Sequence, residues 1–489
     1  MAEDKKKNNL WNFVDTLEGD KVVWMIVLML ILISIVAIFS STSMLALQKG
    51  TSRLAIISDQ LKISLAGLFV IIVCYNIKSI RFFRVVSQTG FFISIVLLAI
   101  LAGHRPIGPL VPKSINSAWR VIMIGGFQLH VFEVVKVAMI MYLAWAVNSY
   151  RNDSFKLANF LAKKKPFWGK PIVKKMMYLY IPMFSVCLGI MVGSLSSTLF
   201  IGGIMFVTIL IGGISVRELL LPLAAAGVGL FLCIGINSMS DKPSSEKPFP
   251  HLESALKRLN SDTMGNAFEA MKDNGPGTQA FQDALDKIKQ PVSAKIAIKE
   301  GGLKGKGPGR STQRYIVPIM FEDYMYSFIV EEYGLLGGIV VIILYISLLA
   351  RGSIIVRNCE NHFAKTAVAG LVVLITGQAM MHIMINCDLG PLTGQTLPMI
   401  SHGKSSFIMF SLAFGIILSI SRMAKRKIDR EAAKAKPLMN RTGMDEVEGS
   451  MNDLDMLESG IRMEDLDGKG LPMYENDIPD YGLDDHNNE

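Results

Sequence analysis

The sequence has few cysteines, and none stands where a disulfide framework would need it. All five lie in or beside apolar runs, and the long polar stretch at about 237–322 contains none. A small secreted domain held by disulfides is therefore excluded. The chain also lacks a Walker-type loop, an HExxH pair, a Cys/His cluster and a GxSxG motif. These motifs would have indicated a nucleotide-driven enzyme, a zinc site or a serine hydrolase.

Charge is scarce over long stretches of the chain. Apolar residues make up 51% of the 489 residues, and they form runs of about 15–25, the length that crosses a bilayer's hydrocarbon layer. We predict an all-α polytopic membrane protein with ten spans. They lie at about 22–45, 61–77, 86–101, 131–147, 177–195, 198–214, 219–236, 324–349, 364–385 and 405–420. No cleavage site precedes the first span, so we expect it to be retained.

Basic residues select one face of this bundle. They gather before the first span (Lys5, Lys6, Lys7) and again after the second, fourth, eighth and tenth spans. All these positions fall on the same side, which the positive-inside rule makes cytoplasmic. Both termini are then cytoplasmic, and a large loop at 237–322 lies outside. The net charge of +9 is explained by these loops and does not indicate nucleic-acid binding.

Three regions follow along the chain: a cytoplasmic segment 1–21, a membrane domain 22–423 and a cytoplasmic tail 424–489. Helical spacing in the outer loop predicts a two-piece amphipathic cap, packed on the bilayer or on the spans, with a turn at 274–277 between the pieces. The spacing is carried by Leu252, Leu256, Leu259, Phe281, Leu285 and Ile288. Residues 441–489 hold fifteen acidic and three basic residues, which predicts disorder.

One stretch, 295–334, combines several features of an anion site. Lys304, Lys306 and Arg310 alternate with glycines, whose backbone can approach an anion closely. Asp323 then stands before a long apolar helix, where poor solvation favours use as a general base. A flexible basic loop followed by a helix cap accounts for the same residues, and both interpretations stay open.

Charged and irregular segments also occur within the predicted membrane region. Glu133 and Lys136 share one helical face, either as a pair that holds the bundle together or as part of a polar cavity wall. At least one of Glu331 and Glu332 should bond to a basic group or a backbone amide on another span. The Gly- and Pro-containing segment 386–406 cannot continue a helix or face lipid, so we expect it to line an outward cavity.

These motifs resemble one family, the SEDS proteins (shape, elongation, division, sporulation). KIAIKEGGLKGKGPGRSTQRYIVP and EDYMYSFIVEEYGLLGG resemble the signature before their eighth span. PLTGQTLPMISHGKSS is similar to their PVTGLPLPFISYGGSS, and NSAWR…HVFEVVKVAMIMYLA to their NGARR…QPSELAKLALILYLA. The resemblance covers about 22–422, and its details are closer to the division branch than to the elongation branch.

The resemblance implies a glycosyltransferase that polymerises lipid II at the outer leaflet of the bacterial cytoplasmic membrane. It implies a class B penicillin-binding protein and other division proteins as partners, and no nucleic acid. A divalent cation at the diphosphate is left open, because no dedicated ligand set is visible. Two other classes remain: a flippase for the same lipid-linked precursor, and a non-catalytic scaffold that acts through the acidic tail.

The family's motifs transfer to particular residues of this chain. Its essential carboxylate, in TDFIFA, falls on Asp323, which we expect to take the acceptor proton as the diphosphate leaves with inversion. The expected substrate-binding residues are Arg120, Glu133, Lys136, Lys304, Lys306, Arg310, Gln313, Glu332, Ser401, Lys404, Ser405 and Ser406.

The chain also departs from the family's motifs. His402-Gly403-Lys404 replaces Tyr-Gly-Gly, which makes Lys404 a candidate anion ligand. The Asp of the family's QPDLGT falls on Leu195, and Val131-Phe132 replaces the Pro-Ser before Glu133.

Overall fold

The computed structural model describes residues 18–42, 45–46, 50–115, 118–239, 263–316, 320–390 and 394–441. The predictions for Lys5–Lys7, for the helical piece around Leu252–Leu259 and for the acidic tail beyond 441 lie outside these residues. Residues 1–428 form one compact unit, and 429–489 are assigned to a second.

Nine helices of the described residues are long and apolar enough to span a membrane. They are α2 (Lys21–Ser41), α4 (Arg53–Asn76), α5 (Ile80–Gly103), α6 (Val131–Arg151), the continuous run from Pro171 to Met191 (α8, η2 and α9), α11 (Val216–Ser238), α16 (Met325–Asn358), α17 (His362–Asn386) and α18 (Lys404–Arg441). A further apolar helix, α10 (Leu195–Ile211), is shorter, at 17 residues. The all-α polytopic class is confirmed, while the count of ten stays a prediction.

One end of the bundle is held by ion pairs that join distant parts of the chain. Asp20 caps α2 by accepting hydrogen bonds from the backbone N–H groups of Val22 and Val23, and it pairs with Arg351 of α16 at 2.7 Å. Glu18 pairs with Arg422 of α18 at 2.9 Å. The start of α2 and the distal parts of α16 and α18 therefore meet at one end, as expected for loops on a common face.

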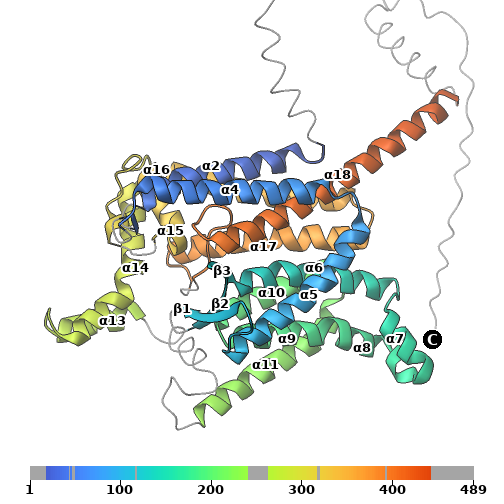
Figure 1. Ribbon diagram of the computed structural model, residues 1–489, viewed down its shortest axis with the longest axis horizontal. Coiled ribbons are helices and arrows are strands. Elements are labelled where there is room, and N and C mark those ends of the chain that lie inside the picture. Colours follow the sequence, from blue (N-terminus) through green and yellow to red (C-terminus); the bar gives the residue numbers. More distant parts are fainter. Residues whose placement is uncertain are drawn as a thin grey trace, which may run out of the picture. The chain divides into compact units, whose positions relative to one another are not determined.

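Helices α6 and α17 form the centre of the bundle, and α11 lies at its periphery. In α6, 78% of the apolar window is buried, compared with 13% in α11. The helices α2, α4, α16, α17 and the first part of α18 run alongside one another in Figure 1. Glycines permit their close approach: a Cβ on Gly370 of α17 would lie 2.6 Å from the Ile140 side chain of α6.

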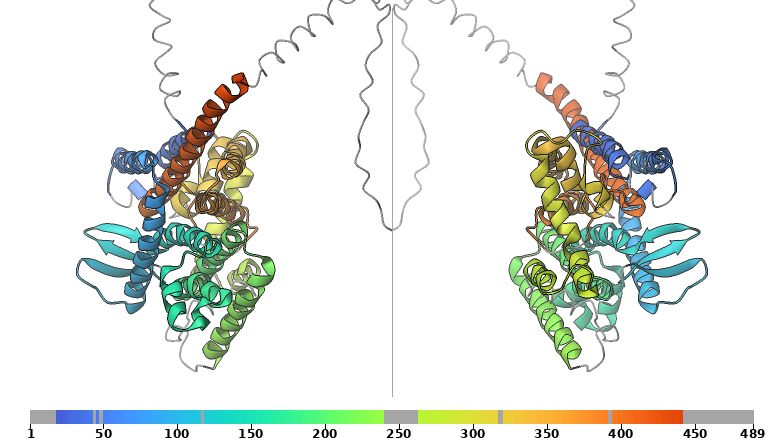
Figure 2. Two further views of the ribbon diagram at one scale, coloured as in Figure 1. Left: turned by 90° about the vertical axis from the view of Figure 1, so that its right-hand side faces the viewer. Right: turned by 90° about the vertical axis from the view of Figure 1, so that its left-hand side faces the viewer.

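A three-stranded antiparallel sheet precedes α6 and was not anticipated from the sequence. It consists of β1 (Leu110–Ile115), β2 (Ala118–Ile124) and β3 (Phe127–His130), in that spatial order, and it projects beside α5 in Figure 2. Gly125 and Gly126, both with positive φ, form the two-residue turn between β2 and β3. β3 ends at His130, and α6 starts at the next residue, so the sheet sets the position of the first turn of α6.

Two helices follow the undescribed part of the large loop. The turn predicted at 274–277 is confirmed, because it joins α13 (Thr263–Asp273) to α14 (Gln279–Gly301). Ala267, Ala284 and Ile288 form a small apolar cluster between these helices. α14 packs against α16, so this half of the predicted cap rests on the bundle.

The glycine-rich loop after α14 docks onto a break in α16. Gly334 has φ 71°, which interrupts the helix. Backbone N–H groups of Lys306 and Gly307 donate to the carbonyls of Glu331 and Glu332, and the Leu335 N–H donates to the Gly302 carbonyl. The N–H groups of Lys306 and Gly307 are thus bonded to α16 and are not free to bind an anion.

Candidate active site

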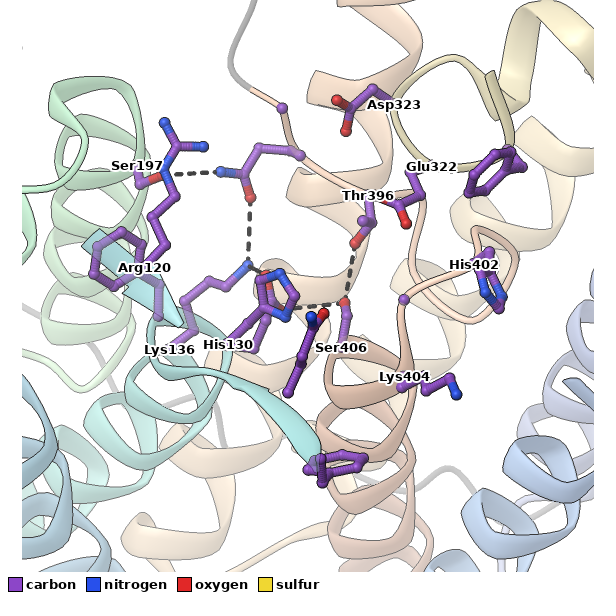
Figure 3. Close-up of a pocket in the computed structure, with 18 of the residues that line it drawn as sticks. Arg120, His130, Lys136, Ser197, Glu322, Asp323, Thr396, His402, Lys404 and Ser406 are labelled. Atoms are coloured by element: carbon purple, nitrogen blue, oxygen red, sulfur yellow. Dashed lines mark hydrogen bonds and ion pairs between the residues drawn. The ribbon is translucent and has the colours of Figure 1, made fainter. Parts of the chain in front are cut away.

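A polar cavity of about 510 Å³ lies at the end of the bundle opposite the Asp20–Arg351 pair. It is enclosed by the sheet, the first turns of α6 and α18, the short helix α15 (Met320–Asp323) and the loop 394–403. Figure 3 shows its polar side chains converging from these elements. Its charged lining residues are Arg120, Glu133, Lys136, Glu322, Asp323 and Lys404. The prediction that segment 386–406 lines a cavity is confirmed for its described part.

Asp323 is held at the wall of this cavity by hydrogen bonds to the backbone of residues 321–323. The Asn386 side chain donates to the Asp323 carbonyl at 3.1 Å. Ser401 donates to the Glu322 carbonyl at 2.8 Å, and the His402 N–H donates to the Phe321 carbonyl. Among the described residues the Asp323 carboxylate accepts no hydrogen bond. A carboxylate fixed in this way can accept a proton from a ligand in the cavity.

Burial and a nearby cation shift the pKa of this carboxylate in opposite directions. Burial raises the pKa of Asp323 to about 6, and the positive charge of Arg120 partly offsets the rise. Arg120 enters from β2, and Figure 3 shows it on a different side of the cavity from Asp323. The site therefore pairs a weakly solvated base with a cation across an open space.

Gly394 borders that space between the two charges. A Cβ built there would lie 3.8 Å from Asp323 Oδ2 and 3.9 Å from Arg120 Nη1. Its φ of +61° is also a conformation that suits glycine. A glycine at this position leaves room for a ligand between the carboxylate and the guanidinium.

Lys136 and Glu133 satisfy both of the interpretations left open by the sequence. They form an ion pair at 2.7 Å and both line the cavity. The Lys136 ammonium also donates to Gln378 Oε1 at 2.6 Å and Gln395 Oε1 at 3.3 Å. An ammonium has three donors, so all are used within the protein. The pair thus joins α6 to α17 and to the 394–403 loop, and it stiffens the cavity floor.

The predicted serines hold the cavity's walls together. Ser406 lines it, bonding to Thr396 at 3.0 Å and donating to Glu133 at 3.4 Å. Ser405 lies just behind and accepts from the His130 backbone N–H at 3.2 Å. Ser401 supports α15 through the Glu322 carbonyl, as described above. These contacts tie the start of α18 to β3 and α6, and the 394–403 loop to α15.

Lys404 stands at the cavity's edge. Its side chain is 47% exposed, and its ammonium lies 3.9 Å from Asp59 of α4. His402 beside it also lines the cavity and bonds to Gln60 Oε1 at 3.1 Å. An exposed, weakly paired ammonium can turn toward a ligand at little cost, so Lys404 remains a candidate anion ligand.

The remaining predicted site residues lie away from the cavity, and this corrects their expected position. Lys304 and Arg310 are exposed on the glycine-rich loop, and neither lines the cavity. Lys306 pairs with Glu331 at 2.9 Å and with Glu300. These bonds anchor Lys306, and with it the loop, to α16, while anion binding by Lys304 and Arg310 stays a prediction.

Gln313 and Glu332 belong to the same docking region. The buried Gln313 donates its backbone N–H to Glu331 at 3.3 Å. Glu332 accepts from Ser40 of α2 at 2.6 Å and lies 3.7 Å from Arg314. Both glutamates therefore meet a basic group, but Lys306 and Arg314 belong to the loop before α16 and not to another span as expected.

Several polar residues of the site were not singled out from the sequence. Gln378, Gln395, Ser197 and Thr396 connect Lys136 to neighbouring elements, and His130 bonds to Ser405 through Nδ1 at 3.0 Å. Their signal was a lone glutamine or histidine within or beside an apolar run, which costs free energy unless it is bonded. In the described part of the chain, no group of three or more His, Cys, Asp or Glu side chains could hold a metal ion.

Together, the fold and the cavity define a multi-pass helical membrane protein with a carboxylate that accepts no hydrogen bond from the described residues, in a polar cavity at one end of its spans. The chain belongs to the FtsW/RodA/SpoVE family of cell cycle proteins, whose profile matches residues 20–245 and 278–426.

Individual relatives agree with this assignment. The chain is 27% identical over 406 residues to the probable peptidoglycan glycosyltransferase FtsW of Lactococcus lactis, covering 81% of this chain and 90% of the relative. It is 32% identical over 146 residues to stage V sporulation protein E of Bacillus subtilis, covering 30% and 40%. It is 33% identical over 131 residues to the peptidoglycan glycosyltransferase MrdB of Escherichia coli, covering 26% and 35%.

The fold is also found in a solved structure. A chain from a peptidoglycan synthase complex that coordinates polymerization and crosslinking superposes with a TM-score of 0.56 at 18% identity. The match covers 83% of this chain and 98% of that chain.

Proposed function

We propose that this protein is a peptidoglycan glycosyltransferase that polymerises lipid II at the outer face of the bacterial cytoplasmic membrane during cell division. The names of its relatives, FtsW and MrdB among them, support the activity. The observation that carries the proposal is the carboxylate of Asp323, which faces a polar cavity beside Arg120 with no hydrogen bond from the described protein.

The chemistry follows from this geometry. Asp323 takes the proton of the acceptor sugar hydroxyl, and the hydroxyl oxygen attacks the anomeric carbon of the donor. The bond from that carbon to the diphosphate breaks on the opposite face, so the configuration inverts and the lipid diphosphate leaves with the electron pair. Negative charge develops on the leaving group, and fixed cations stabilise it.

Arg120 and Lys404 are the cations that we assign to the diphosphate. Lys136 is not assigned this role, because its charge is paired with Glu133 and its donors are used. Lys304, Lys306 and Arg310 are reassigned to the loop that docks on α16. The partner that we propose is a class B penicillin-binding protein, in keeping with the synthase complex that shares the fold, alongside other division proteins.

The test is polymerisation of purified lipid II by the full chain with its penicillin-binding partner. We expect Asp323→Asn to lower the rate at least about hundredfold, the scale of a lost general base, while the protein stays inserted and folded. Asp286→Asn, which changes an exposed carboxylate of α14, is the matched control and should polymerise like the wild type.

The same assay separates the alternative classes. A wild-type chain that moves lipid II between leaflets and makes no glycan would be a flippase, and the proposal would be wrong. Full activity in Asp323→Asn would show that Asp323 is not the general base.

A further inference from the structure

A second, smaller cavity touches Asp323. Its volume is about 60 Å³, and it shares Asp323, Gly394 and Gln395 with the large cavity. Its other lining residues are Gln290 of α14, Tyr324 and Ile385 of α17. A single water needs about 10–15 Å³ measured in this way, so the small cavity has room for water.

The buried hydroxyl of Tyr324 is the observation that indicates a bound molecule in the small cavity. Tyr324 is 1% exposed, and its hydroxyl is buried without a hydrogen-bond partner in the protein's described residues. Buried hydroxyls almost always bond to protein or to ordered water. A tyrosine that lines a cavity with three other polar side chains therefore indicates a water site rather than an empty apolar void.

Gln290 and Asp323 complete the set of partners that a water molecule needs. Gln290 is partly exposed on α14, and its amide has no bond within the described part of the chain. The carboxylate, the amide and the hydroxyl supply the two to four contacts typical of a bound water. Burial raises the pKa of Tyr324, and the negative charges of Asp323 and Asp388 raise it further, so the hydroxyl stays protonated.

Asp323 has to lose a proton after each catalytic cycle, and the small cavity offers a route for it. Each glycosyl transfer leaves one proton on the carboxylate, and the base must lose it before the next cycle. Substrate occupies the large cavity, on the side of Arg120 and Lys404. The small cavity reaches the carboxylate from the side of α14 instead. The charge of Asp388 acts on Tyr324, which lines this cavity, and Asp388 is 41% exposed and paired with Lys295 of α14.

We propose that the small cavity is a water site that carries the proton from Asp323 to the outer surface, with Tyr324 and Gln290 holding the water in place. The proton moves from the acceptor hydroxyl to Asp323, then to this water, and from there to bulk solvent near Asp388. Each transfer breaks one O–H bond and forms another, and nothing is oxidised or reduced. The proposal rests on the proposed glycosyltransferase function and adds a positioning role for Tyr324 and Gln290.

Two substitutions test the proposal in the full chain with its partner. Tyr324→Phe removes only the hydroxyl, and the family's TDFIFA motif has Phe at this position, so we expect it to fold. Gln290→Met keeps the length of the side chain and removes its amide. The control is Tyr333→Phe, because Tyr333 of α16 also has a buried hydroxyl without a partner among the described residues but does not line either cavity.

The readout is the polymerisation rate as a function of pH, in H₂O and in D₂O. Each substitution removes a group that holds the water, so the hydrogen bond from the water to the Asp323 carboxylate is weakened. Loss of a hydrogen bond to a carboxylate raises its pKa, so the acid limb of the profile should move to higher pH in both variants. We expect kcat to fall about three- to tenfold, a modest part of what general-base chemistry supplies, with a changed solvent isotope effect. KM for lipid II and the melting temperature should stay close to the wild type.

Each result is decisive. Variants with the wild-type rate, pH profile and isotope effect would overturn the water site, as would an equal change in Tyr333→Phe. If Tyr324→Phe loses its cooperative melting transition, Gln290→Met carries the same test. A wild-type chain that makes no polymer would overturn the proposed function itself, which is a different result from normal polymerisation by both variants.

Discussion

Asp323 and Arg120 show how much of the site depends on residues that are far apart in the chain. Asp323 ends the short helix α15, and Arg120 belongs to a strand in front of α6. Arg120 is the neighbouring charge that lowers the pKa of Asp323 against the effect of burial. The balance between these two effects sets the pH at which the base becomes available.

The pH dependence of polymerisation follows from this balance. The pKa of Asp323 is raised to about 6, so the carboxylate is protonated and inactive below that pH. We expect the rate to fall as the pH drops through about 6, approaching tenfold per pH unit well below the pKa. Replacing Arg120 with Gln removes a charge that lowers the pKa, so the acid limb should move to higher pH.

The measurement is the pH of half-maximal kcat for the wild type and Arg120→Gln. Arg105→Gln is the matched control, because Arg105 is an exposed arginine on the segment just before the sheet and does not line the cavity. An acid limb that stays in place in Arg120→Gln would contradict the electrostatic coupling of Arg120 to Asp323.

At the scale of elements, the glycine-rich loop is a structural joint between α14 and α16. Its backbone bonds to α16 on both sides of the Gly334 break. Glu331, which is fully buried, reinforces the joint by accepting from Lys306 at 2.9 Å and from the Thr312 N–H at 2.8 Å. The joint fixes the start of α16, and with it the helix α15 that carries Asp323.

Gly305 is the position where this joint tolerates no side chain. A Cβ there would lie 2.3 Å from the Glu332 carbonyl oxygen, and φ is +81°. We expect Gly305→Ala to lower the free energy of unfolding by about 3–5 kcal/mol, combining overpacking with a left-handed backbone. Gly309→Ala has a similar φ of +76° but open space around it, and should cost only about 1–2 kcal/mol.

Thermal and denaturant unfolding of the two purified variants in detergent would measure this difference. Equal losses of stability for Gly305→Ala and Gly309→Ala would mean that the loop does not dock closely on α16. It would then be free to bind an anion, as the sequence first suggested.

At the scale of the whole molecule, the proposed chemistry is contained in the membrane domain. All residues that line the cavity precede residue 407, and the family match ends at residue 426. Helix α18 itself continues to Arg441, past the boundary at 424 that the sequence suggested for the tail.

Removal of residues 442–489 therefore tests whether the tail is needed for polymerisation. We expect the truncated protein to polymerise lipid II with its partner at the wild-type rate, because the cavity and its supports are intact. Reconstitution in vesicles of the full and truncated chains gives the comparison. Loss of polymerisation on truncation would show that the tail acts on catalysis, and normal polymerisation with failed division in cells would assign it to recruitment.

Sequence patterns were reliable where a single segment determines its own structure. A run of apolar residues long enough for the bilayer must form a helix, because its backbone groups have no other partners in lipid. The limits of α6 and α17 therefore lie within a few residues of those expected. The small sheet was missed, although the Gly125-Gly126 turn between apolar runs is a hairpin signal.

The sequence alone determined that this is a membrane-spanning member of its family with a carboxylate at Asp323, because span length and motif order are local properties. Only the tertiary structure decided which cations face that carboxylate. Glycines allow close approach of the backbone to an anion or to another helix equally well. The pattern of glycines in the loop therefore could not show whether the loop contacts an anion or a helix. Folding brought α16 to the glycine-rich loop and left Arg120 and Lys404 at the cavity.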